Sequence, residues 1–231
     1  MKVDIWSDIR CPFCYIGKRK LETALQDFDH KDEVEIVWHS FELEPDLVSN
    51  PTENIYDHLA KRKRISKEQS VQMHKQMGAY AKAEGLSFNF DSIVVANSFD
   101  GHRLIHLAHG LGLGGVAKER LFKSYYTEGA DISNKTVLVN LGKEIGLDPT
   151  VVQEMLDGDA YGAEVREDEQ HAHEIGVTGV PFFVINQRYA VSGAQPSDIF
   201  LKALDHAWKE QEQEAVLSVA DSTSCDIDGN C

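Results

Sequence analysis

Strand-like segments at both ends of this chain enclose a long block of helical periodicity, and this order restricts the possible folds. Residues 2–8 are largely apolar and residues 34–43 are rich in β-branched and aromatic side chains, so both segments predict strands. Between them, Ile16, Leu21 and Leu25 have helical spacing. The chain therefore opens with β-α-β, and a crossover of this length predicts two parallel strands.

Helical spacing of apolar residues continues almost throughout residues 51–174, where several segments end at a glycine. Strand character returns at residues 179–186 and 188–194, and residues 196–211 predict a closing amphipathic helix. There is no internal repeat and no low-complexity linker, so we expect the helical block to be an insertion. The predicted fold class is α/β. Its parts are a domain built from both chain ends and an all-helical insertion domain, namely residues 1–50 with 175–212 and residues 51–174.

Two cysteines, Cys11 and Cys14, follow the first predicted strand. Their spacing is compatible with half of a zinc site, a small structural disulfide or a redox-active pair. Pro12 suits the first position of a helix, so Cys11 would lie at the N-cap, where free backbone N–H groups and the helix dipole favour a thiolate. On this interpretation Cys11 is the attacking sulfur, and Cys14, one turn further, resolves the mixed disulfide.

The remaining cysteines, Cys225 and Cys231, are the natural partners of the first pair in a zinc site. Their five-residue separation fits such a site loosely, and we expect no metal and no cofactor. A structural Cys11–Cys14 disulfide would close too small a loop to stabilise the chain much.

Three histidines, His102, His106 and His109, would share one face of a helix and could form a metal triad. We prefer the interpretation that they line the cleft under the insertion or are hydrogen-bonded within it.

The last segment, residues 213–231, becomes polar and acidic after a short apolar run at residues 215–220, and it contains Cys225 and Cys231. The closing helix is expected to end near Gln211, which leaves a tail of about twenty residues that is long enough to reach across the domain. We predict that Cys225 and Cys231 form a secondary redox pair that acts as a relay for the first. The alternative is a mobile tail whose cysteines are incidental.

Pro181 opens a predicted strand, directly after Val180. Proline cannot donate to a strand ladder, so a place at the start of an edge strand is one explanation. The other is a cis Val180–Pro181 bond, which would turn the backbone of Val180 outward beside Cys11, free to pair with an extended substrate segment.

The formal net charge of −15 argues against nucleic acid or an anionic membrane as a partner. No apolar run approaches the roughly 18–20 residues of a membrane span. The first residues lack the basic and long apolar regions of a secretory signal, so we expect a cytoplasmic protein. In that compartment ordinary thiols stay reduced, which favours a catalytic role for the cysteines.

These residues carry a family resemblance. "WSDIRCPFC" near the start, the late "GVPFFVIN", the β-α-β opening and the long helical insertion resemble the DsbA-type branch of the thioredoxin superfamily. "NSFDGHRLIHLA" is similar to its FrnE-like cytosolic members. The resemblance spans about residues 2–212 and implies a thioredoxin fold with a helical insertion.

By this resemblance Cys11 is the nucleophile, Cys14 the resolving thiol and Pro181 the cis-proline. We also expect Val180, Pro12 and Phe13 to contact substrate. Pro12-Phe13 lacks the histidine of the strongly oxidising periplasmic relatives, so a weaker oxidant is expected. FrnE-like chains often end in a C-x4-C pair, where this chain has C-x5-C.

The predicted function is thiol-disulfide exchange, as a protein disulfide reductase or isomerase. Its substrates would be disulfide-containing proteins or peptides, with glutathione or a thioredoxin-type protein as reductant. The alternative is a glutathione-dependent transferase or isomerase acting on small aromatic molecules, because relatives with the same insertion use the cleft that way. Those relatives usually have a serine in place of Cys11 and need no second sulfur, so Cys14 counts against the alternative.

Overall fold

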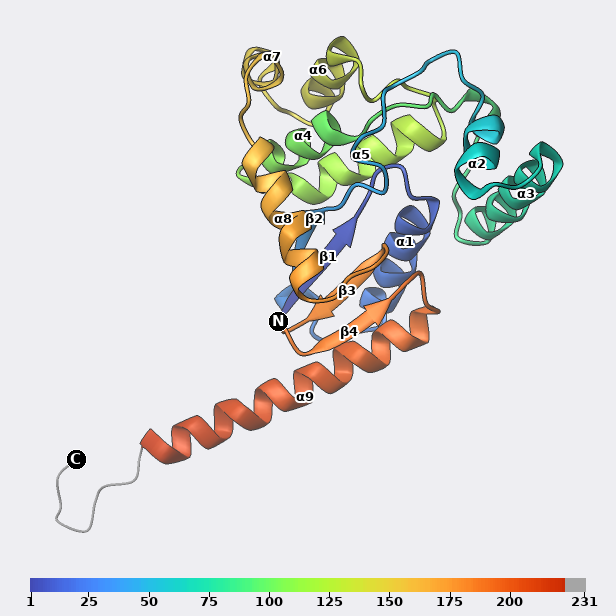
Figure 1. The fold of residues 1–231 in the computed structure, drawn as a ribbon. Helices are drawn as coiled ribbons and strands as arrows, with labels where there is room; N and C mark the ends of the chain where they lie inside the picture. Colours follow the sequence, from blue (N-terminus) through green and yellow to red (C-terminus); the bar gives the residue numbers. More distant parts are fainter. Residues whose placement is uncertain (223–231) are drawn as a thin grey trace, which may run out of the picture.

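A four-stranded sheet built from both ends of the chain lies at the centre of the computed structural model (Figure 1). The structure describes residues 1–222, with side chains as far as residue 214. The strands are β1 (Lys2–Ser7), β2 (Glu35–Ser40), β3 (Phe182–Ile185) and β4 (Tyr189–Ser192).

The strand order is β2-β1-β3-β4. β1 and β2 are parallel, as predicted, whereas β3 is antiparallel to both β1 and β4. Trp6 near the end of β1 pairs with Phe182 at the start of β3. Cys11 lies in the segment that follows β1, and Pro181 lies in the segment that precedes β3. Both segments are therefore at the same end of the two central strands.

Helices α1 (Pro12–Gln26) and α9 (Ser197–Ser222) pack against each other, and α9 also contacts β3 and β4. Phe200 of α9 lies edge-on to Phe183 of β3, with ring centroids 4.7 Å apart. Figure 1 shows α9 continuing well past the sheet.

The prediction that the closing helix ends near Gln211 is wrong, because α9 continues to Ser222. Residues 212–222 contain no glycine or proline, and most of residues 212–217 are glutamate, glutamine, alanine or leucine, which are favourable in helices. The acidic and polar residues on either side of the short apolar run at residues 215–220 concealed the continuation of the helix. Cys225 and Cys231 lie outside the described residues.

The block between β2 and β3 is helical, as predicted (Figure 1). A single-turn helix, η1 (Lys31–Glu33), precedes β2, and another, η2 (Phe90–Ser92), lies within the block. Its α-helices are α2 (Ile55–Lys63), α3 (Lys67–Ala83), α4 (Phe99–His109), α5 (Gly114–Tyr126), α6 (Lys135–Glu144), α7 (Pro149–Asp157) and α8 (Gly162–Glu174).

The insertion shares its interior with the sheet. Phe122 of α5 and Leu138 of α6 belong to the same buried core as Ile5 and Phe183. α5 and α8 both contact β2. Side chains of the insertion therefore reach the sheet from which the cysteine loop departs.

Within residues 1–222 the structure contains no helix with the length and apolar character needed to cross a lipid bilayer.

Candidate redox site

Cys11 lies at the N-cap of α1, as predicted. Its backbone is extended, with φ −93° and ψ 111°, and Pro12 occupies the first helical turn. The Cys11 N–H donates to the carbonyl of Asp8 at 3.1 Å, and the Cys14 N–H donates to the carbonyl of Cys11 at 3.0 Å. Both thiols are free. The sulfur of Cys11 thus lies where a helix N-terminus presents unpaired N–H groups and a positive dipole end.

The two sulfurs have different surroundings. Cys11 is 4% exposed and Cys14 only 1%. Burial raises the pKa of the Cys14 thiol well above its usual value, and the neighbouring Cys11 sulfur raises it further, while Ser7 and Lys118 oppose this rise. Cys14 is therefore the shielded thiol of the pair, protonated in the reduced protein at neutral pH.

The Val180–Pro181 bond is cis, which agrees with the sequence prediction. The Cys11 thiol donates to the carbonyl of Val180 across 3.4 Å, although 169 residues separate them in the chain. The Gly193 N–H donates to the carbonyl of Pro181 at 2.8 Å and attaches the loop to the end of β4. In the described part of the chain, the Val180 N–H donates to no backbone carbonyl.

Gly17 brings α1 against this loop. A Cβ atom at residue 17 would lie 3.0 Å from Cγ of Pro181 and 3.2 Å from Cζ of Phe183. Both separations are tighter than ordinary van der Waals contact, so only glycine allows the helix to approach Pro181 this closely. Gly17 is not among the sequence-predicted site residues, because a single glycine in a helical pattern carries no specific signal.

Phe13 is 43% exposed between the two buried cysteines and presents an apolar ring beside the site. A small surface pocket adjoins the loop. It is lined by residues of the loop and of the end of β4: Gly176, Thr178, Gly179, Val180, Pro181, Phe182, Ser192 and Gly193. The structure therefore places Val180, Pro12 and Phe13 around Cys11, and their contact with substrate stays a prediction.

Asp8 holds the turn before Cys11. Its Oδ1 accepts from the Arg10 N–H at 3.0 Å and from Oγ of Ser98 at 2.9 Å, and its Oδ2 accepts from the Leu43 N–H at 2.9 Å. These bonds connect the cysteine loop to the segment after β2 and to the start of α4. Asp8 is wholly buried and positions the loop.

Lys118 of α5 is also wholly buried behind the cysteines. Its Nζ donates to the carbonyl of Ser7 at 3.0 Å and lies 5.2 Å and 5.6 Å from the ring centroids of Phe122 and Trp38. Lys118 is not among the sequence-predicted site residues. Its spacing could have indicated a buried lysine, because Lys118 shares an apolar helix face with Leu121 and Phe122, three and four residues further along.

The histidines of α4 have different carboxylate partners. Nε2 of His102 lies 3.5 Å from Oδ1 of Asp8, and Nε2 of His106 lies 3.0 Å from Oδ2 of Asp168. His106 Nε2 is also 3.1 Å from Oγ of Ser40. Across residues 1–222, no three histidine, cysteine or acidic side chains gather as metal ligands.

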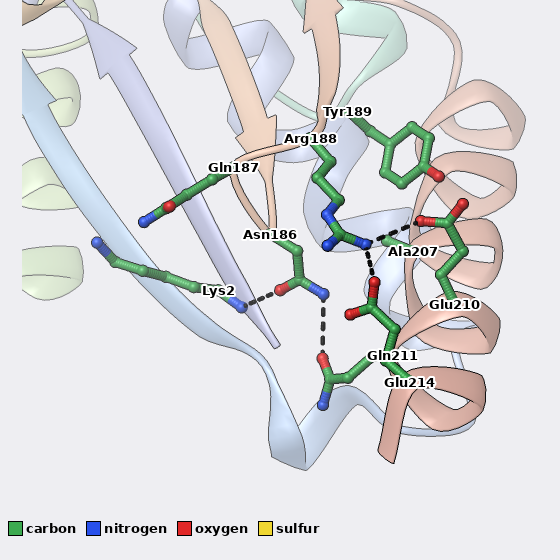
Figure 2. Close-up of a pocket in the computed structure, with 9 residues that line it drawn as sticks. All are labelled: Lys2, Asn186, Gln187, Arg188, Tyr189, Ala207, Glu210, Gln211 and Glu214. Atoms are coloured by element: carbon green, nitrogen blue, oxygen red, sulfur yellow. Dashed lines mark hydrogen bonds and ion pairs between the residues drawn. The ribbon is translucent and has the colours of Figure 1, made fainter. Parts of the chain in front are cut away.

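A larger pocket, shown in Figure 2, lies at the opposite end of the sheet, beside the β3–β4 turn. Arg188 donates to Glu214 and lies 3.5 Å from Glu210, and Nδ2 of Asn186 donates to Oε1 of Gln211 at 3.0 Å (Figure 2). These polar groups already pair with one another and attach α9 to the turn, so this pocket is structural.

The DSBA-like thioredoxin domain family matches residues 2–205. The chain belongs to this family. The predicted DsbA-type resemblance is confirmed at that level, and so is the fold class, a mixed α/β thioredoxin-like fold with a helical insertion between β2 and β3. The FrnE-like assignment stays a prediction.

This DsbA-like chain is 39% identical to a probable DsbA oxidoreductase from Streptomyces coelicolor, whose crystal structure matches with a TM-score of 0.85 over 91% of each chain. It is 28% identical over 220 residues to the uncharacterized protein YwbO from Bacillus subtilis, an alignment that covers 90% of this chain and 98% of YwbO. A 2-hydroxychromene-2-carboxylate isomerase matches at 16% identity and a TM-score of 0.64, over 94% of this chain and 99% of that one. At that identity the last comparison shows a shared fold only.

Proposed function

We propose that this DsbA-like protein is a thiol-disulfide oxidoreductase that reduces or isomerises protein disulfides in the cytoplasm. The observation that carries the proposal is the contact between the Cys11 thiol and the carbonyl of Val180, 3.4 Å away in the loop before Pro181. It joins a sulfur at a helix N-terminus to a backbone segment that an extended peptide could pair with. A reducing compartment would maintain Cys11 and Cys14 as a dithiol.

The first step is attack by the Cys11 thiolate on one sulfur of a substrate disulfide. A bond forms between Cys11 and that sulfur, the substrate disulfide breaks, and the other substrate sulfur leaves as a thiolate that takes a proton from water. The positive end of the α1 dipole stabilises the attacking thiolate.

Reduction and isomerisation differ in the second step, in which a thiol attacks the mixed disulfide between Cys11 and the substrate. In reduction, Cys14 loses its proton and attacks Cys11, which forms the Cys11–Cys14 disulfide and releases the second substrate thiolate, so two electrons pass to the substrate. A thiol reductant, either glutathione or a thioredoxin-type protein, then restores the dithiol. In isomerisation, another substrate thiol attacks the mixed disulfide instead, and the site leaves reduced.

Substrate would bind beside Cys11 through its backbone. The Val180 N–H donates to no backbone carbonyl in the described residues, and its carbonyl now accepts only the Cys11 thiol, so both could pair with an extended segment. The exposed Phe13 ring would cover an apolar side chain of that segment.

The test is refolding of scrambled ribonuclease in a glutathione buffer. The wild-type protein should accelerate recovery of ribonuclease activity, Cys11→Ser should abolish the acceleration, and Cys14→Ser should accumulate mixed disulfides visible on non-reducing gels. A wild-type protein that leaves the refolding rate unchanged would contradict the proposal.

The same variants test the glutathione-dependent isomerase or transferase. That chemistry needs one sulfur to hold or activate glutathione, so Cys14→Ser should then leave turnover of small aromatic substrates intact. The free, buried Cys14 directly behind Cys11 favours the two-sulfur mechanism.

A further inference from the structure

Lys118 is a buried amine without a carboxylate partner among the described residues. It is wholly buried, its one hydrogen bond is to the carbonyl of Ser7, and it forms no ion pair with any described side chain. A buried ammonium group is costly unless an anion or several hydrogen-bond acceptors compensate it. The rings of Trp38 and Phe122 compensate only partly, from centroid distances of 5.6 Å and 5.2 Å.

The cysteine sulfurs lie within electrostatic reach of this amine. Burial has the largest effect on the pKa of Lys118 and lowers it to about 8. Four acidic groups oppose this decrease, in order of decreasing effect Cys14, Asp8, Cys11 and Asp168. In the opposite direction, Lys118 lowers the pKa of Cys14. The carboxylate of Asp8 is already used by two backbone N–H groups and Ser98, so the Cys14 thiolate is the anion that Lys118 still lacks.

We propose that Lys118 is a positioning and proton-transfer residue for the second half of disulfide exchange, in which it takes the proton of Cys14 and pairs with the resulting thiolate. The inference rests on the proposed function and assigns to the insertion a part in the chemistry of the sheet domain.

Because its pKa is about 8, Lys118 has a minor neutral form at neutral pH. This neutral amine accepts the proton of the Cys14 thiol, which gives an ammonium and a thiolate in the same buried space. The thiolate attacks Cys11, the Cys11–Cys14 disulfide forms, and the bond from Cys11 to the substrate sulfur breaks. The substrate leaves as a thiolate that takes a proton from water. When a reductant thiolate next attacks Cys11, Cys14 leaves as a thiolate and takes its proton back from Lys118, which restores the neutral amine.

The first test is the reaction of the reduced protein with 5,5′-dithiobis(2-nitrobenzoate), in a Cys225→Ser/Cys231→Ser background. Attack by Cys11 releases one coloured thiolate, and resolution by Cys14 releases a second, so one absorbance trace reports both steps. Lys118→Met and Lys118→Gln should slow the second release about tenfold or more near neutral pH and change the first by no more than about twofold. Lys123→Met is the matched control, because it removes an exposed lysine from the same helix.

The two substitutions separate a chemical role from a structural one. Glutamine retains an N–H group for the carbonyl of Ser7 but carries no charge and accepts no proton from a thiol. If Lys118 only holds Ser7, Lys118→Gln should behave like the parent while Lys118→Met is slow, and that result would overturn the proposal. Equal slowing of both releases would overturn it as well.

The second test does not depend on exchange. In a Cys11→Ser background that also lacks the tail cysteines, thiolate absorbance reports the titration of Cys14 alone. Asp8, His102, Tyr126 and Asp168 are titratable groups that face Lys118 or Cys14 and influence this titration, and the Ser7 hydroxyl lowers the pKa of Cys14. Lys118→Gln should raise the pKa of Cys14 by about one unit or more, and an unchanged pKa would overturn the inference.

The two proposals fail in different ways. If the wild-type protein shows both releases but does not refold scrambled ribonuclease, the proposed function is wrong and Lys118 still acts on Cys14. If it refolds ribonuclease and the Lys118 variants resolve at the parental rate, only the inference about Lys118 is wrong.

Discussion

Cys11 and Cys14 differ in ways that assign them separate tasks. Cys11 lies at a helix N-terminus and contacts the carbonyl of Val180, whereas Cys14 is 1% exposed and its pKa is raised by burial and by the Cys11 sulfur. A thiolate is the reactive form of cysteine, so the protonated, shielded sulfur is suited to the later step.

Brief alkylation of the reduced protein near neutral pH should therefore label Cys11 first. We expect iodoacetamide to modify Cys11 about tenfold faster than Cys14, measured by mass spectrometry of the peptides. In Cys11→Ser, labelling of Cys14 should stay slow, since Cys14 remains buried. Faster modification of Cys14 in the wild-type protein would reverse the two roles.

Gly17→Ala tests the contact between α1 and the loop at Pro181. The new Cβ would lie 3.0 Å from Pro181 Cγ, so the loop must move by a few tenths of an ångström relative to Cys11. We expect exchange activity to fall about three- to tenfold. Melting temperature should change little, because the strain offsets the roughly 1 kcal/mol gained by replacing a helical glycine.

Gly78→Ala is the control for this variant. Gly78 also lies in a helix, α3, but its Cβ would meet only the ring of Phe90 at an ordinary 3.7 Å. This variant should be more stable and fully active. Full activity of Gly17→Ala would show that the close approach of α1 to Pro181 is unnecessary for exchange.

At the scale of elements, His39 connects β2 to its neighbours. Its Nδ1 lies 2.6 Å from Oδ1 of Asp168 on α8, and its Nε2 lies 2.8 Å from Oδ1 of Asp4 on β1. Burial alone would lower the pKa of His39, but the hydrogen bonds to Asp168 and Asp4 outweigh burial and raise it to about 9. The charged imidazolium thus joins the insertion to the sheet.

This pairing predicts a loss of stability at alkaline pH. A pKa raised from 6.5 to about 9 on folding gives stability that is fully present below pH 6.5 and disappears as pH rises through about 9. The difference amounts to about 3 kcal/mol in the free energy of unfolding. Urea unfolding across this range should show the decline in the wild-type protein and in His206→Gln, an exposed control, but not in His39→Gln.

The sequence predicted the elements well where short-range patterns determine them. Strand and helix periods gave the order of elements, and Pro12 indicated the N-cap at Cys11. The end of α9 was misplaced because acidic and polar residues on either side of the short apolar run at residues 215–220 resemble the composition of a tail. Lys118 and Gly17 act on the site through contacts between segments far apart in the chain, which no local pattern contains.

At the scale of the whole molecule, three separated parts of the chain build the site. The β1–α1 segment supplies the sulfurs, the loop before β3 supplies Val180 and Pro181, and α5 of the insertion supplies Lys118. The insertion and the sheet share one core, so each part buries apolar side chains of the other.

The secondary redox pair also belongs to this scale and stays a prediction. Cys225 and Cys231 follow the end of α9 at Ser222, so Cys225→Ser/Cys231→Ser replaces no residue of that helix. If Cys225 and Cys231 relay electrons, this double variant should lose about half or more of the exchange rate in glutathione buffer. Full retention of the rate, measured with scrambled ribonuclease, would make the tail cysteines incidental.

The distance in sequence between Cys11 and Val180 also affects how the protein is made. Val180 is translated 169 residues after Cys11, which takes roughly 8–34 s at about 5–20 residues per second. During that interval the nascent chain has both sulfurs but not the loop that contacts Cys11. A newly synthesised molecule is therefore most open to oxidation or wrong pairing before synthesis is complete, and its redox centre is among the last parts to be assembled.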